Sequence, residues 1–195
     1  YIAVTGVQTC ALPISLQPTI SRRNGWVEHP DDDLWDTLVR TLRTLFDSFE
    51  GDSARIVGLG LCSIRCCRVF LKPDGSLAQP VMSWMDVRAY ETFQDDPGIG
   101  YTGSTSGYLT FRLTGELHDT IANSLQYQFP IDVHTWQWSQ DPDHFNSFGI
   151  PREKLLGMKL PGEILGHVTE EAAAQTGLPV GLPVVATAND KAVEA

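Results

Sequence analysis

The sequence predicts an α/β or α+β fold, because amphipathic helical patterns alternate with short apolar runs that are typical of buried strands. The strongest helical pattern covers residues 31–50, and a second one covers residues 169–177. Apolar runs occupy residues 55–62, 68–72 and 183–188. With 195 residues and 42% hydrophobic side chains, the chain is long enough to bury a sizeable core.

The first helix is predicted over residues 31–50. Three aspartates, residues 31–33, stand in its first turn, where negative charge suits the positive end of the helix dipole. Gly51 is expected to end it. Its apolar residues recur at steps of three and four, which places them on one face: Leu34, Trp35, Leu38, Leu42, Leu45, Phe46 and Phe49.

The next part of the chain predicts strands. Residues 55–62 and 68–72 are short apolar runs and are interpreted as two buried strands. Residues 73–76, Pro-Asp-Gly-Ser, have the composition of a turn. Residues 77–84 are expected to form a third strand or an extended segment, and residues 86–93 a helix.

The second half predicts mostly short elements. Residues 94–107 are rich in Asp, Gly, Ser and Thr and are expected to be a loop. Residues 107–115 fit a helix that ends at its last glycine, and residues 151–156 fit a short helix. In the helix at residues 169–177, Thr169 is a suitable N-cap, two glutamates follow it, and the final glycine ends the helix.

Composition and charge exclude several classes of protein. Only 19% of residues are charged, which argues against a disordered chain. The formal net charge of −10 repels phosphate backbones, so we expect no nucleic-acid partner. No stretch reaches the ~18–20 apolar residues of a membrane helix, and the N-terminus has no secretory signal pattern. The four cysteines lack the spacing of a disulfide framework, which favours the cytoplasm.

Residues 4–15 resemble the in-frame translation of a short-read sequencing adapter. We therefore interpret residues 1–15 as non-native and residues 16–195 as the biological sequence. The alternative is a genuine strand over residues 1–7 followed by a loop.

Four segments stand in a characteristic order: Gly-Trp-Val-Glu-His-Pro at 25–30, Trp-Met-Asp-Val-Arg at 84–88, Leu-Thr-Gly-Glu at 113–116, and Pro-Gly-Glu-Ile-Leu-Gly-His-Val-Thr at 161–169. Together they resemble the N-terminal domain of the FGGY family of carbohydrate kinases, which includes xylulokinase, ribulokinase, fuculokinase and glycerol kinase. The resemblance implies an actin-like, ribonuclease-H-like α/β fold and a second domain, outside this chain, that carries most of the ATP contacts.

The resemblance also implies an activity. Members transfer the γ-phosphate of ATP to a hydroxyl of a sugar or polyol, with Mg²⁺, and are cytoplasmic and often homodimeric. Because the family's Asp-x-Gly-Thr phosphate hairpin and the second domain are not recognised in this chain, we expect the 195 residues alone to be inactive. Two other hypotheses are a non-catalytic sugar-sensing module on the same fold and an actin-like ATPase. The segment at 84–88 argues against the ATPase.

The candidate catalytic residue is Asp190, which follows the apolar run at 183–188. Phosphoryl transfer needs a carboxylate that accepts the proton of the attacking hydroxyl, and the resemblance assigns that role to Asp190. Spacing alone favours Asp190 as the N-cap of a following helix, whereas the resemblance favours the base, and one side chain can fill both roles.

The candidate sugar-binding residues come from two segments. Arg65 and Cys66 lie where the family's sugar-binding turn falls, and Arg65 could instead form a surface ion pair. Cys66 replaces a His or Glu of the family, and Ile64 a Gln, so the identity of the sugar is not transferable. Cys62, Cys66 and Cys67 have no second ligand cluster, so we interpret them as buried thiols of a strand rather than a metal site.

The second segment contributes Trp84, Asp86 and Arg88. By the resemblance it borders the sugar pocket, where the indole of Trp84 could stack on a sugar face. Trp84 could equally belong to the hydrophobic core. Asp86 and Arg88 are two positions apart and would project together only in certain turns.

Overall fold

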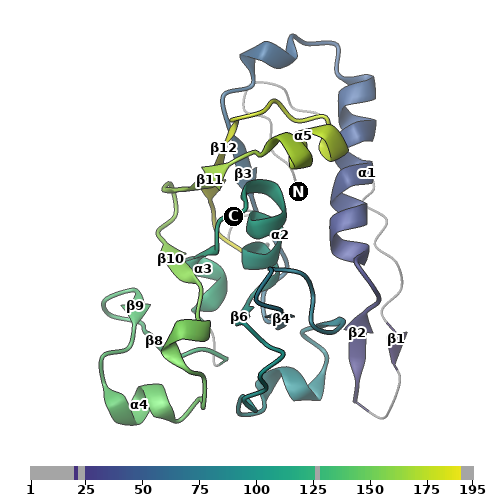
Figure 1. The fold of residues 1–195 in the computed structure, drawn as a ribbon. Helices are drawn as coiled ribbons and strands as arrows, with labels where there is room; N and C mark the ends of the chain where they lie inside the picture. The colour runs from purple at the N-terminus through teal and green to yellow at the C-terminus, as the bar shows by residue number, and fades with distance from the viewer. Residues whose placement is uncertain (1–19, 22–24, 126–127, 190–195) are drawn as a thin grey trace.

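In the computed structural model, residues 20–21, 25–125 and 128–189 are described (Figure 1). The helices are α1 (Asp33–Ser48), η1 (Ser53–Arg55), η2 (Val87–Tyr90), α2 (Thr105–Thr114), α3 (Ile121–Ser124), α4 (Pro142–Asn146), η3 (Arg152–Lys154) and α5 (Glu170–Thr176), where η denotes a 3₁₀ helix. The strands are β1 (Ile20–Ser21), β2 (Val27–His29), β3 (Leu59–Leu61), β4 (Val69–Leu71), β5 (Val81–Met82), β6 (Tyr101–Gly103), β7 (His118–Thr120), β8 (Ile131–Asp132), β9 (Gln137–Trp138), β10 (Gly157–Lys159), β11 (Ile164–His167) and β12 (Pro183–Ala186). Helices and strands are mixed along the chain, which confirms the predicted α/β class.

The strands form several small sheets. β11, β12 and β3 make one three-stranded sheet, and β1, β2 and β5 make another. Two-stranded pairs are formed by β4 with β6, β7 with β10, and β8 with β9. β12 runs antiparallel to β11 but parallel to β3, with Val184 opposite Leu59 and Ala186 opposite Leu61.

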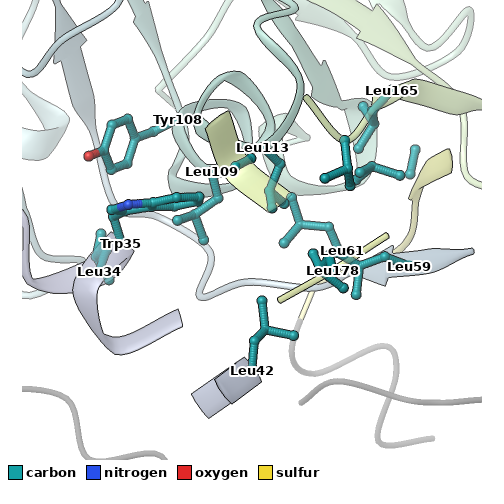
Figure 2. Packing of buried hydrophobic residues seen from close by; sticks show 14 of the residues in the cluster. Leu34, Trp35, Leu42, Leu59, Leu61, Tyr108, Leu109, Leu113, Leu165 and Leu178 are labelled. Atoms are coloured by element: carbon teal, nitrogen blue, oxygen red, sulfur yellow. The ribbon is translucent and has the colours of Figure 1, made fainter. Parts of the chain in front are cut away.

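Helix α2 lies at the centre of the molecule, with α1 on one side and α5 beside both (Figure 1). The predicted apolar face of α1 packs inward, where Trp35 is 2% exposed and Leu42 is 1% exposed. Figure 2 shows these side chains meeting residues from β3, α2 and the segment after α5, including Leu59, Leu61, Tyr108, Leu113 and Leu178. A second buried cluster lies below α2 and contains Phe70, Met82, Ala89, Phe93, Ile121, Phe129, Ile131 and Ile150.

The capped helices end where their sequences predict. Thr169 accepts a hydrogen bond from the Ala172 N–H at the start of α5. Gly177 and Gly115 end α5 and α2 with φ values of 82° and 74°, in the left-handed region that glycine tolerates best. The turn at residues 73–76 and the strands at residues 68–72 and 183–188 are also confirmed, with narrower bounds.

Three expectations for the segment from 77 to 107 were only partly right. Only Val81–Met82 is strand within residues 77–84. Within residues 86–93 only Val87–Tyr90 is helical, as the 3₁₀ turn η2, and the Arg68 guanidinium donates to the Glu91 carbonyl just after it at 2.7 Å. The expected loop at residues 94–107 contains β6 and the first turn of α2. Its serine and threonine side chains are buried and hydrogen-bonded, which a local pattern cannot reveal.

Two other elements are shorter than expected. The predicted strand at residues 55–62 is regular only in Leu59–Leu61, after the 3₁₀ turn η1. The predicted helix at residues 151–156 is a single 3₁₀ turn, η3, since the Leu155 N–H bonds to the Arg152 carbonyl three residues back.

Candidate functional site

Two loops leave the sheet at the same edge. Because β3 and β12 are parallel, residues 62–66 and residues 187–189 both follow the carboxyl ends of their strands. The Thr187 hydroxyl donates to the Leu61 carbonyl at 2.5 Å and ties the two exits together. Ligands of open α/β sheets bind outside the carboxyl ends of the strands, so this edge is the candidate site.

The loop at residues 62–66 carries the first two candidate sugar-binding residues. Arg65 is exposed, and Cys66 is partly buried with a φ of 63°, which is uncommon for a residue other than glycine. The Gln128 amide holds this strained turn by donating to the Cys66 carbonyl at 2.9 Å and to the Ala89 carbonyl at 3.0 Å. The expectation that the cysteines lie buried in a strand was wrong, since all three follow β3 and only Cys67 is fully buried.

Trp84 lies beside this loop rather than in the core. Its side chain is 52% exposed, and the Tyr90 hydroxyl donates to its carbonyl at 3.2 Å. Burial and a hydrogen bond with Cys66 raise the pKa of Tyr90. Tyr90 therefore joins the loop of Cys66 to the turn of Trp84. No motif marks Tyr90, apart from its place near the Trp-Met-Asp-Val-Arg segment.

Asp86 and Arg88 form an ion pair. Asp86 is fully buried, and its carboxylate accepts from Nε and Nη2 of Arg88 at 2.9 and 2.6 Å. It also accepts from the backbone N–H groups of Val27 and Arg88. Burial raises the pKa of Asp86, but these hydrogen bonds outweigh it and leave the pKa below its ordinary value.

Arg88 extends the same network toward the N-terminal strands. Its Nη2 donates to Glu28 at 2.8 Å, and its guanidinium lies 3.6 Å from the centroid of the Trp26 ring. The hydrogen bonds that Arg88 donates to the Asp86 carboxylate are the main reason that the pKa of Arg88 is raised. The pair fixes the turn that presents Trp84.

Asp190, the candidate base, lies outside the described residues, but the segment that leads to it is described. The Thr187 carbonyl accepts from the Thr120 hydroxyl at 2.7 Å. The Asn189 side-chain amide donates to the Ala122 carbonyl at 3.3 Å. Both contacts come from residues next to or within α3.

A buried polar network lies beneath the edge and centres on Asp119. Its carboxylate accepts from the hydroxyls of Ser104 and Ser106 and from the N–H groups of Ser104 and Thr120. Burial is the main reason that the pKa of Asp119 is raised. The network fixes the start of α2 against β7, which explains why the polar residues before α2 are buried.

A cavity of about 710 Å³ lies elsewhere, between the start of α1, the turn after β4, α2 and α5. Its lining includes Asp32, Tyr108, Phe111, Arg112 and Gln175, and contains none of the candidate site residues. Asp32 is bonded there to the Tyr108 hydroxyl and to the Arg112 guanidinium. The cavity is therefore separate from the sheet edge.

Within the described ranges, no group of three or more His, Cys, Asp or Glu side chains could hold a metal ion. No described residue is assigned to Mg²⁺ below. No helix of the described residues is both long and apolar enough to span a membrane.

Comparison with known proteins gives consistent results. The family described as "FGGY family of carbohydrate kinases, N-terminal domain" matches residues 98–195. A protein named "Uncharacterized sugar kinase YgcE" from Escherichia coli K12 is 48% identical over 181 residues, which cover 92% of this chain and 37% of that protein. A glycerol kinase from Alteromonas mediterranea is 22% identical and is matched over 87% of this chain and 42% of its own length.

Solved structures agree with the sequence matches. The xylulose kinase from Rhodospirillum rubrum superimposes with a TM-score of 0.74 at 25% identity, over 89% of this chain and 42% of that one. A glycerol kinase from Plasmodium falciparum shares the fold, with a TM-score of 0.65 at 16% identity over 89% of this chain and 42% of that one. The chain thus spans about two fifths of the length of these relatives.

Proposed function

Because the chain belongs to the FGGY family of carbohydrate kinases, we propose that the whole protein transfers the γ-phosphate of ATP to a hydroxyl of a sugar or polyol. The sugar side of the site lies in this chain, at the shared edge of β3 and β12. By the family resemblance, most of the contacts to ATP and Mg²⁺ are expected outside this chain. The observation that carries the proposal is the parallel pairing of β3 with β12, which sends the sugar-binding loop and the segment before Asp190 to one edge.

Asp190 is proposed as the general base. The Thr187 and Asn189 contacts hold the last described residues before it against β3 and α3. A carboxylate at such a strand end is placed to accept the proton of the attacking hydroxyl as the phosphoryl group transfers. Alignment is the main requirement of this reaction, since phosphoryl transfer involves little covalent chemistry of the protein.

Arg65, Cys66 and Trp84 are proposed to contact the sugar directly. The exposed Arg65 guanidinium offers several N–H donors to hydroxyl groups, and the exposed Trp84 indole offers an apolar face for a sugar ring. Cys66 is a weak donor and acceptor beside them. Asp86 and Arg88 were expected to bind the sugar. We propose instead that they affect sugar binding indirectly, by holding the turn that contains Trp84.

The test uses the complete protein and a panel of ketoses, aldoses and polyols. With the best substrate, Asp190→Asn is expected to abolish turnover while sugar affinity, measured by calorimetry without ATP, stays nearly the same. Asp143→Asn on the exposed helix α4 is the matched control and should keep full activity. A retained kcat in Asp190→Asn would remove the assigned base, and sugar binding without phosphorylation by the wild type would favour the sensing module.

The proposal also includes a cellular location and an oligomeric state. We propose that the protein acts in the cytoplasm, which the cysteine pattern and an activity that consumes ATP support. Sedimentation of the complete protein would test the homodimer that the family resemblance implies.

A further inference from the structure

Residues 119–124, which join the end of β7 to α3, contact both loops of the sheet edge. Thr120 and Ala122 bond to residues 187–189, and Asn123 bonds to the loop at residues 62–66. These contacts bridge 60 or more positions in sequence. One short segment therefore contacts both the loop that contains the proposed sugar-binding residues and the segment that leads to Asp190.

The first arm of this segment is Asn123, which is 2% exposed. Its side-chain amide donates to the Ser63 hydroxyl at 2.8 Å and to the Ser106 hydroxyl at 2.9 Å. Both amide protons are thus used. Its Oδ1 is buried and has no hydrogen-bond partner among the described residues, so the donated bonds set the orientation of the amide.

The bond to Ser63 continues into the loop backbone. Ser63 and Thr105 hydroxyls lie 2.9 Å apart, and the Thr105 hydroxyl donates to the Ile64 carbonyl at 2.8 Å. Each hydroxyl has one proton, so Ser63 must donate to Thr105. The result is a directed chain from the Asn123 amide through Ser63 and Thr105 to the Ile64 carbonyl, one residue before Arg65.

The second arm is Thr120, which is fully buried. Its hydroxyl donates to the Thr187 carbonyl at 2.7 Å, and the Thr187 hydroxyl donates to the Leu61 carbonyl at 2.5 Å. Two residues further on in each segment, the Asn189 amide donates to the Ala122 carbonyl. This arm therefore fixes the three residues that precede Asp190.

Hydrogen bonds to Asp119 hold the segment, and therefore both arms, in place. It accepts hydrogen bonds from the Thr120 N–H at 2.7 Å and from the Ser104 hydroxyl at 2.7 Å. It also accepts from the Ser106 hydroxyl, which in turn accepts from Asn123. A shift of either arm would disturb this fully buried network.

We propose that residues 119–124 are a two-armed bracket that sets the position of the acceptor sugar relative to the base. Asn123 is the positioning residue for the sugar-binding loop, and Thr120 is the positioning residue for the segment that leads to Asp190. Neither side chain touches the reacting groups. This inference rests on the proposed function, because only a sugar kinase requires the two loops to be aligned for one reaction.

The two arms predict different kinetic effects in the complete protein. Asn123→Ala and the milder Ser63→Ala free the sugar-binding loop, and we expect the KM for the sugar to rise about tenfold with a smaller change in kcat. Thr120→Val keeps the side-chain shape but frees the base segment, and we expect kcat to fall about tenfold or more with a smaller change in KM, since a misplacement of about 1 Å can cost ~100-fold in rate. Thr120→Ser keeps the hydroxyl and should restore most of the kcat.

Thr176→Val is the matched control. The Thr176 hydroxyl is buried at the end of α5, donates to the Ala172 carbonyl at 2.6 Å and accepts from the Leu178 N–H at 3.2 Å. The substitution therefore removes a buried hydroxyl-to-carbonyl bond away from the sheet edge. We expect it to lower stability without separating kcat from KM. If Thr120→Val and Asn123→Ala change both parameters in the same proportion as Thr176→Val, or if Thr120→Ser fails to recover kcat, the bracket is wrong.

The proposed function is tested separately, by measuring sugar binding and phosphate transfer in the wild type. If the wild type binds a sugar but transfers no phosphate, the kinase proposal fails, and a tenfold weaker sugar Kd for Asn123→Ala in calorimetry still supports the first arm. An unchanged Kd in that case overturns it. A wild type that binds no sugar of the panel overturns both proposals.

Discussion

Replacing Asp86 by alanine should be among the most damaging single changes at the sheet edge. The carboxylate is fully buried and accepts two bonds from the Arg88 guanidinium and two from backbone N–H groups. The substitution leaves those N–H groups without an acceptor and leaves a guanidinium, 15% exposed, beside Glu28 alone. Removing one partner of a buried ion pair costs about 3–5 kcal/mol, and the remaining Glu28 contact places our estimate at about 3 kcal/mol.

Asp52→Ala is the matched control. Asp52 also precedes a 3₁₀ turn and accepts from a backbone N–H two residues on, that of Ala54, at 3.0 Å. It is exposed and bonded to no cation in the described structure, so its removal should cost about 0.5–1 kcal/mol.

Urea unfolding followed by circular dichroism measures the difference. With an m-value of about 2 kcal/mol/M, Asp86→Ala should lower the midpoint by about 1.5 M and Asp52→Ala by less than about 0.5 M. The pH dependence has a fixed sign. Because the pKa of Asp86 is lowered on folding, its contribution is present above the ordinary carboxyl pKa and is lost as the pH falls through the lowered value. Equal midpoint shifts for the two variants, or a gap between wild type and Asp86→Ala that widens on acidification, would refute this account.

Two further predictions concern buried groups away from the sheet edge. Burial lowers the pKa of His29 below its ordinary 6.5, and Asp33 offsets this only in part, so the wild type should lose stability as the pH falls from about 7 toward 5. In urea unfolding at these two pH values, His29→Gln should lose less stability than the wild type. An identical loss in both proteins would contradict the prediction. In Gly107→Ala the new Cβ would lie 2.4 Å from Leu156 Cδ1 and 2.8 Å from Asp119 Oδ2, which should cost about 1–3 kcal/mol, whereas Gly115→Ala at φ 74° meets no atom within 4 Å and should cost about 1 kcal/mol of backbone strain. The reverse order of the two thermal midpoints would show that the packing around Asp119 is looser than described.

Elements with a strong local signal were predictable from the sequence. The apolar face of α1, the Thr169 cap and the glycine at the end of α5 each act within a few residues, so a short window contains the information. The start of α2 was missed because its polar side chains are buried by a carboxylate 13 to 15 positions later. Such a partner is invisible to a local pattern, and Ser104 and Ser106 therefore resembled a loop.

The candidate site shows the same division. Arg65, Cys66 and Trp84 were predicted from motifs, and Tyr90 joins the turns of Cys66 and Trp84. That Asp86 and Arg88 pair with each other could not be read from their spacing, because only the 3₁₀ geometry of η2 brings Arg88 Nε back onto the Asp86 carboxylate.

Asn123 and Thr120 had no motif to mark them, yet a physical signal was present. The run Asp-Thr-Ile-Ala-Asn-Ser at residues 119–124 is mostly polar and is followed by Leu125. A polar run that is buried must find hydrogen-bond partners, and in an α/β protein the partners within reach are the loops at the ends of parallel strands. Had residues 118–120 been recognised as a strand, the run would have been placed beneath the sheet edge, and its contacts to both loops would have followed. The alignment of the two loops thus depends on side chains that do not contact the sugar. Substitutions of these side chains should alter kcat or the KM for the sugar without altering the groups that contact it.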